Sequence, residues 1–173
     1  ARELFSEAFS AAWSGRAESD GFDRLVMLAG LTWRQVVVLR AYAKYLRQTG
    51  STFSQDYIER CLAANVGIAR MLVRLFEVRF DPDRFGGIRT NGSHDVERFD
   101  AADELATKVR EALDQVASLD QDRILRSLLG LVLATLRTNF FQTTGGEPMP
   151  YVSFKLDPQA VPDLPQPRPE FEI

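Results

Sequence analysis

Three basic side chains at helical spacing have the clearest potential for chemistry. Arg40, Lys44 and Arg47 fall on one face of a predicted helix, and Arg34 lies about a turn and a half before Arg40. Clustered Lys and Arg supply most of the nonspecific affinity of proteins for nucleic acid. The formal net charge of −3 gives no general attraction for polyanions, so a solvated helix face or intrachain ion pairs are the favoured interpretation.

The helices before and after residues 50–52 resemble a helix-turn-helix in their spacing. The second of them presents Gln55, Asp56, Glu59 and Arg60. This is a poor set for a groove lined by phosphates, so the pattern gives little support to DNA recognition.

The chain also holds two glycine pairs, Gly86-Gly87 and Gly145-Gly146. Neither stands between a strand and a helix at the spacing that dinucleotide-binding and phosphate-binding loops require. Both pairs are therefore predicted to form turns.

Three carboxylates, Asp100, Asp103 and Glu104, form an acidic cluster. The helical pattern places them at the start of a helix, where negative charge complements the helix dipole, so a metal is not needed to explain them.

Single titratable residues complete the inventory. His94 lies in a predicted loop with no Ser or Cys nucleophile tied to it, so we expect it to be solvated. Cys61 falls on an apolar helix position, where packing is its expected role. The sequence therefore predicts no catalytic, cofactor-binding or metal-binding residue in this chain.

Composition limits the class of protein. A chain of 173 residues with 45% hydrophobic content can bury one core but is short for two ordinary domains. The single Cys61 excludes an internal disulfide and fits a reducing compartment. No apolar run approaches the roughly 20 residues that span a bilayer, and no signal-peptide pattern opens the chain. We therefore expect a cytoplasmic protein without a membrane partner.

Hydrophobic spacing predicts helices over most of residues 1–142. A capping box is expected at Thr32 and Gln35, a left-handed cap at Gly30, and an N-cap at Asp120. The last two helices should pair as an αα-hairpin. The predicted helical ranges are 4–13, 22–29, 32–49, 52–63, 65–80, 96–116 and 120–136, with a loop or short hairpin at 83–94.

The character of the sequence changes after Phe141. Residues 143–150 form turns, and the alternation of apolar and polar residues over 151–156 predicts a half-buried strand. Closely spaced prolines then indicate an extended connector. The predicted fold is mostly α: a helical bundle of about six helices with an αα-hairpin, ending in a short strand and a Pro-rich connector. We expect the chain to divide into a helical domain at residues 1–142 and a connecting segment at residues 143–173, which holds the strand and the Pro-rich stretch and leads to a catalytic domain absent from this chain.

Both ends of the chain are expected to be cuts in a longer protein. The first residue, Ala1, already lies in a helical pattern without an initiator Met. The triplet Phe171-Glu172-Ile173 alternates like the opening of a strand.

Long strings of residues resemble a known family. The chain is similar to the large-subunit bacterial NAD-specific glutamate dehydrogenases, in the helical segment just before the catalytic domain. The strings that carry this resemblance are residues 31–48, 53–59, 69–82, 137–142, 153–158 and 162–173.

The resemblance implies that the intact protein converts L-glutamate, NAD and water into 2-oxoglutarate, ammonia and NADH. The family's catalytic lysines and aspartate and its glycine-rich NAD motif are expected beyond Ile173, so none is transferred to a residue here. The leading hypothesis is a non-catalytic helical fragment with a structural, subunit-contact or regulatory role, inactive by itself and without a cofactor of its own.

The partners that this hypothesis implies are the rest of the parent chain, above all its catalytic domain, and like subunits in a homo-oligomer. The alternative is an autonomous helical module that binds an allosteric ligand or nucleic acid.

Overall fold

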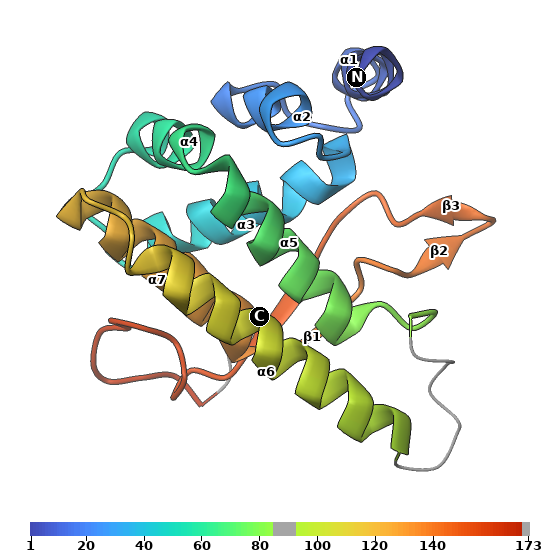
Figure 1. Ribbon diagram of the computed structural model, residues 1–173. Helices are drawn as coiled ribbons and strands as arrows, with labels where there is room; N and C mark the ends of the chain where they lie inside the picture. The colour runs from blue at the N-terminus through green and yellow to red at the C-terminus, as the bar shows by residue number, and fades with distance from the viewer. Residues whose placement is uncertain (85–92, 171–173) are drawn as a thin grey trace.

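Helices make up most of the computed structural model, which describes residues 1–84 and 93–170, the side chains of 93–95 excepted (Figure 1). The mostly α class is confirmed, with seven α-helices and one 3-10 helix in the described ranges. The helices are α1 (Arg2–Trp13), η1 (Gly21–Asp23), α2 (Arg24–Leu28), α3 (Trp33–Gln48), α4 (Gln55–Ala64), α5 (Val66–Phe80), α6 (Ser93–Leu113) and α7 (Leu119–Ala134). The predicted loop at 83–94 falls mainly on residues 85–92, outside the described part.

Local side-chain chemistry sets several of the helix boundaries. At α3, Thr32 Oγ1 accepts from the Gln35 N–H while Gln35 Oε1 accepts from the Thr32 N–H, which is the predicted capping box. Helix α4 begins at Gln55, later than the predicted start at residue 52, because Ser54 Oγ accepts from the Tyr57 N–H. Gly30 follows α2 with a φ of +64°, the left-handed conformation that glycine adopts without steric cost.

Two further predictions about helix starts were wrong. The N-cap of α7 is Ser118, two residues before the predicted Asp120, because the Ser118 hydroxyl accepts from the Gln121 N–H. Helix α6 begins at Ser93, so Asp100, Asp103 and Glu104 lie beyond its first turn, where the dipole has little effect. Glu104 is instead paired with Lys108 along the helix surface.

The last helix also ends earlier than predicted. Thr135 has extended backbone angles and starts strand β1 (Thr135–Thr138), so Leu136 belongs to a strand and not to α7. The Thr135 side chain is fully buried, and its Oγ1 lies 2.7 Å from the Tyr42 hydroxyl. A β-branched residue fixed by a buried partner favours the extended conformation over another helical turn.

Strand β1 pairs antiparallel with β4 (Phe154–Leu156). The register places Thr135 opposite Leu156 and Thr138 opposite Phe154. The predicted strand over 151–156 is therefore present only in its last three residues. The short strands β2 (Thr143–Thr144) and β3 (Glu147–Pro148) form a hairpin that projects from the helices (Figure 1), with Gly145 and Gly146 both at positive φ in its turn.

An aromatic cluster lies at the centre of the core. The fully buried ring of Phe76 on α5 contacts five other rings in the described part of the chain. These rings belong to Tyr42, Phe80, Phe140, Phe141 and Phe154. Since Phe154 lies beyond residue 142, the same core contains residues from both sides of the predicted division.

Helices α6 and α7 run antiparallel and are joined by residues 114–118, which confirms the αα-hairpin (Figure 1). The Pro-rich stretch after β4 has no regular secondary structure, but it bends back onto the helices rather than running straight. Val161 is buried in the core, and a Cβ added at Gly130 of α7 would overlap the ring of Pro162. The first half of this stretch is thus packed against the helical bundle.

Candidate functional site

The basic stripe predicted from the sequence is engaged in contacts within the chain. Lys44 Nζ pairs with the carboxylate of Glu18, and Arg47 donates to Gln55 Oε1 at 3.5 Å. Arg34 donates to the carbonyl oxygen of Phe140 at 2.8 Å. The interpretation as intrachain ion pairs is confirmed for Lys44 and Arg40, while Arg34 and Arg47 donate to neutral groups.

Arg40 is the most enclosed member of this stripe, with 4% of its surface exposed. Its Nε lies 2.8 Å from Asp20 Oδ2, and its Nη2 lies 2.9 Å from Asp23 Oδ1. Burial alone lowers the pKa of Arg40, but the hydrogen bond and charge of Asp20, with Asp23 and Glu18, outweigh it and raise the pKa. This arginine joins α3 to the turn that carries η1.

A polar network continues from Arg40 into α4. Gln55 Nε2 donates to Glu59 Oε1 at 2.9 Å and lies 3.4 Å from Asp20 Oδ2. Glu59 is buried against Gly21, where a Cβ would collide with its carboxylate. The carboxylates of Asp20, Asp23 and Glu59 each accept a hydrogen bond within this network. These charged residues therefore have a structural role in joining η1, α3 and α4.

The remaining residues considered from the sequence are separated in the structure. Cys61 is buried on α4, and its thiol lies 3.8 Å from the Gln121 carbonyl oxygen; burial raises its pKa to about 12. The side chain of His94 and the pair Gly86-Gly87 lie outside the described residues. The pair Gly145-Gly146 forms a hairpin turn, as predicted. No group of three or more potential metal ligands is found among the residues that the structure describes.

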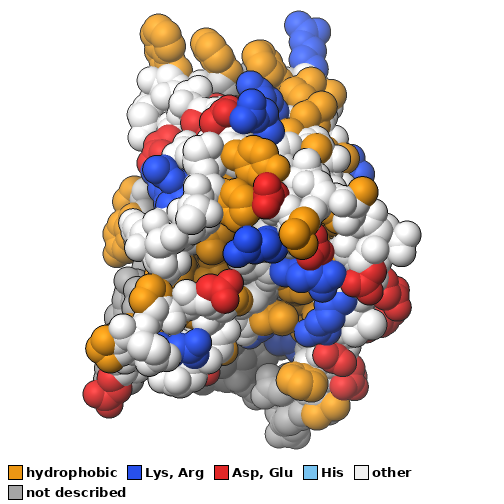
Figure 2. Space-filling view, turned by 90° about the vertical axis from the view of Figure 1, so that its left-hand side faces the viewer, with side chains coloured by type: hydrophobic (Ala, Val, Ile, Leu, Met, Phe, Trp, Pro, Cys, Tyr) orange, Lys and Arg blue, Asp and Glu red, His pale blue; other side chains and the backbone are white. Residues whose placement is uncertain are grey.

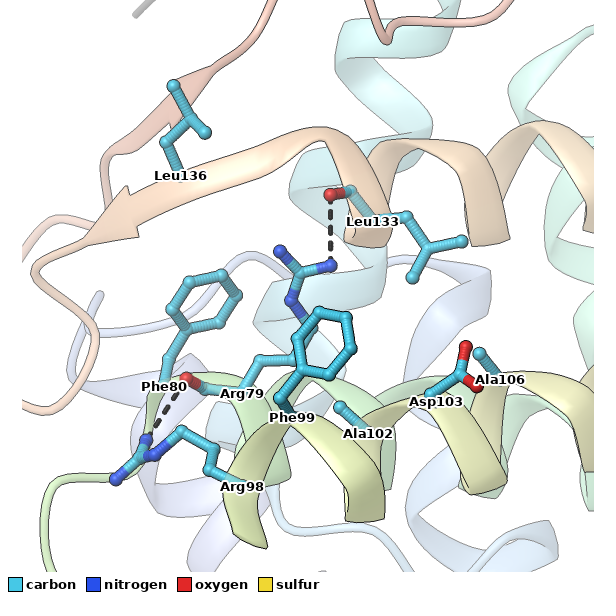
Figure 3. Close-up of a pocket in the computed structure, with 9 residues that line it drawn as sticks. All are labelled: Arg79, Phe80, Arg98, Phe99, Ala102, Asp103, Ala106, Leu133 and Leu136. Carbon is cyan, nitrogen blue, oxygen red and sulfur yellow. Dashed lines mark hydrogen bonds between the residues drawn. The ribbon is translucent and has the colours of Figure 1, made fainter. Parts of the chain in front are cut away.

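Sequence reasoning missed the pocket between the end of α5, the first half of α6 and the junction of α7 with β1. We call it the Arg79 pocket; its volume is about 470 Å³. Figure 3 shows the residues that line the pocket and the elements that carry them. They are Arg79, Phe80, Arg98, Phe99, Ala102, Asp103, Ala106, Leu133 and Leu136. The pocket could not be predicted from the sequence, because α5, α6 and the α7–β1 junction meet only in the folded chain.

Arg79 lies at the junction of these elements. Its Nη1 donates to the Leu133 carbonyl oxygen at 2.9 Å and its Nη2 donates to the Thr135 carbonyl oxygen at 3.0 Å. Arg98 Nη1 donates in turn to the carbonyl oxygen of Arg79 at 3.0 Å (Figure 3). Each arginine therefore satisfies carbonyl groups at a helix C-terminus, where the dipole favours positive charge. Burial lowers the pKa of Arg79.

A second surface feature is a row of aromatic side chains on α1. Phe5, Phe9 and Trp13 follow one another at four-residue spacing, and Trp13 is 85% exposed. Their rings stack, with centroids 6.4 Å apart for Phe5 and Phe9 and 6.2 Å apart for Phe9 and Trp13. Figure 2 shows hydrophobic side chains along the upper edge of the molecule, where α1 lies, and mixed acidic and basic side chains below them. Such a contiguous apolar row on a surface is typical of an interaction site.

Comparison with known proteins agrees with the resemblance in the sequence. The family profile described as glutamate dehydrogenase, helical motif 3, matches residues 17–82. The profile described as the catalytic domain of bacterial NAD-glutamate dehydrogenase matches residues 108–173. Together the two matches include η1 to α5, the C-terminal end of α6 from residue 108, α7 and the strands.

Curated relatives match along nearly the whole chain. The NAD-specific glutamate dehydrogenases of Halomonas elongata, Pseudomonas aeruginosa and Mycobacterium tuberculosis are 44%, 46% and 47% identical to it, over 98–99% of its length. Along nearly its whole length, this chain matches one segment of the large NAD-specific glutamate dehydrogenases. It spans about a tenth of the length of these relatives, since the matched region is 10% of each.

The names of these relatives specify NAD, and the loop that binds such a dinucleotide is glycine-rich. None of the described turns joins a strand to a helix N-terminus through closely spaced glycines, the arrangement that a dinucleotide pyrophosphate requires. No helix in the described ranges is long and apolar enough to cross a bilayer.

Proposed function

We propose that this chain is a non-catalytic helical segment of an NAD-dependent glutamate dehydrogenase. The parent enzyme would convert L-glutamate, NAD and water into 2-oxoglutarate, ammonia and NADH, in the cytoplasm. The observation that carries this proposal is the identity of 44–47% to such enzymes along nearly the whole chain. The predicted division at residue 142, with catalytic residues beyond the segment, is part of the same proposal.

The role that we assign to the segment is contact with other parts of the parent enzyme. The remainder of the polypeptide or a like subunit would cover the rings of Phe5, Phe9 and Trp13. These rings are 57–85% exposed, and exposing so much apolar surface to water is unfavourable. The relatives are about ten times longer than this chain, so a large surface is available to cover the row.

The catalytic part of the proposal is tested by assaying the 173-residue chain for NADH formation from glutamate and NAD. We expect no turnover above the protein-free rate, and robust turnover would show that a complete site lies in these residues. The full-length parent enzyme, assayed in parallel, should produce NADH.

The contact role is tested in the full-length parent enzyme with the double variant Phe9→Ser, Trp13→Ser. We expect a lower oligomer mass or a lower melting temperature, while the same variant of the isolated chain melts as the unchanged chain does. The matched control is Leu119→Ser, which removes a similarly exposed apolar side chain from the start of α7. An assembly unaffected by the double variant would contradict the contact role.

A further inference from the structure

The Arg79 pocket combines a cation with apolar walls. Among the described residues, the Arg79 guanidinium donates to the Leu133 and Thr135 carbonyl oxygens and lies within ion-pair distance of no carboxylate. A guanidinium carries five N–H donors, so donors remain after these two bonds are made. Carbonyl dipoles compensate only part of a full positive charge, which leaves this site attractive to an anion.

The walls around this cation are mainly hydrocarbon. Figure 3 shows the Arg79 guanidinium beside the rings of Phe80 and Phe99, with Leu133 and Leu136 on the opposite side. The Arg79 guanidinium carbon lies 5.2 Å from the centre of the Phe80 ring. A volume of about 470 Å³ falls in the range of small-molecule sites, which are mostly apolar with a few polar groups that fix orientation.

The charges in the pocket select among anions. A guanidinium matches a carboxylate in shape and in donor geometry. Arg98 and Asp103 also line the pocket: Arg98 donates to the Arg79 carbonyl oxygen, and the negative charge of Asp103 would repel a polyanion such as a nucleotide phosphate. Inorganic phosphate would gain nothing from the phenyl and leucine walls, whereas an apolar body attached to a carboxylate would bury surface against them.

We propose that the Arg79 pocket binds a small organic monocarboxylate with an apolar body, its carboxylate on the Arg79 guanidinium and its apolar part between α6 and the α7–β1 junction. This site goes beyond the proposed contact role and does not depend on it. Its position, where three helices and a strand meet, allows a bound acid to fix their relative packing.

The test is a titration of the 173-residue chain with 3-phenylpropionate, followed by heteronuclear NMR. We expect saturable shifts confined to residues around the pocket, with a dissociation constant of about 1 mM, as is usual for a ligand of this size. The uncharged isostere 3-phenylpropanamide should bind at least about tenfold more weakly, since it lacks the carboxylate. Equal binding of the amide, or shifts centred on another surface, would overturn the proposal.

Two variants locate the binding. Arg79→Gln should weaken 3-phenylpropionate binding at least about tenfold and leave amide binding unchanged. Arg74→Gln is the matched control, because Arg74 is an exposed arginine of the same helix outside the pocket. It should bind like the unchanged chain.

Because Arg79→Gln also loses two bonds to the end of α7, Ala102→Leu supplies an independent check. The added side chain fills the pocket and keeps Arg79 in place. Binding that persists in Ala102→Leu would place the ligand elsewhere and refute the assignment.

Discussion

Arg40 and Arg79 are enclosed arginines in two regions of the molecule, and they differ in what neutralises them. Arg40 lies between α3 and η1 and faces the carboxylates of Asp20 and Asp23. Arg79 lies on α5 and, within the described residues, donates to the Leu133 and Thr135 carbonyl oxygens and to no carboxylate. The comparison teaches that the buried Arg40 is neutralised by full counter-charges and is part of the fold, whereas the partly buried Arg79 meets carbonyl dipoles and is the cation of the proposed ligand site.

The largest expected effect is on the Arg40 region. Arg40→Met leaves Asp20 enclosed without its partner, so the free energy of unfolding should fall by about 3–5 kcal/mol. Urea denaturation monitored by circular dichroism measures this change. The control Arg60→Gln removes an exposed ion pair with Asp56 and should cost less than about 0.5 kcal/mol. Equal losses in both variants would show that burial of the Arg40 network contributes nothing.

Cys61 provides a probe of the α4 side of the Arg40 network, because it lies on the helix that also carries Gln55 and Glu59. Its pKa of about 12 keeps the folded thiol neutral, and we expect it to react with a disulfide reagent about a hundredfold more slowly than in the urea-unfolded chain at pH 8. Because burial raises the pKa of Cys61, the folded state favours the neutral thiol. The contribution of this preference to the free energy of unfolding is complete below the pKa of the unfolded thiol and is lost as the pH rises toward 12. Arg40→Met should increase the reaction rate more than Arg79→Met does, because it is expected to destabilise the fold more. A reversed order would contradict the proposed separation of the two regions.

A smaller effect is expected at the Arg79 region. Arg79→Met removes two charge-assisted hydrogen bonds to the end of α7 but leaves no carboxylate unpaired in the described residues, so it should cost about 1–3 kcal/mol. The same urea titration measures it. A loss larger than that of Arg40→Met would contradict the distinction between full and partial neutralisation.

The smallest effect on stability is expected at the wall of the pocket. Phe99 is 72% exposed, so Phe99→Ala should change the free energy of unfolding by less than about 0.5 kcal/mol. The midpoint of thermal unfolding is a sufficient measurement. A loss of several kcal/mol would indicate that Phe99 belongs to the core, and the pocket would then have no open apolar wall.

The helices could be predicted from the sequence where local chemistry decides them. The capping box at Thr32 and Gln35 and the left-handed Gly30 depend on neighbouring residues, and both are present as predicted. The end of α7 could not be predicted in this way. Leu136 continues the apolar helical spacing, and β1 forms through contacts that are distant in the chain: Thr135 with Tyr42, and the pairing with β4.

The Arg79 pocket shows the same limit for the candidate site. Arg79 is one of several basic residues on α5, and its sequence neighbours do not indicate which carbonyl groups it will meet. Its partners Leu133 and Thr135 are more than 50 positions away. The basic stripe of α3 was recognised in the sequence, but its partners Asp20 and Glu18 were not, because ion pairs between elements depend on their packing.

The sequence by itself determined the mostly α class, most helix boundaries and the similarity to NAD-specific glutamate dehydrogenases, because periodicity, caps and long strings of residues are local properties. Tertiary structure alone decided which charges are neutralised. Arg40 and Arg79 are the same residue type on amphipathic helices, and the elements packed against each one supply carboxylates in one case and carbonyl dipoles in the other.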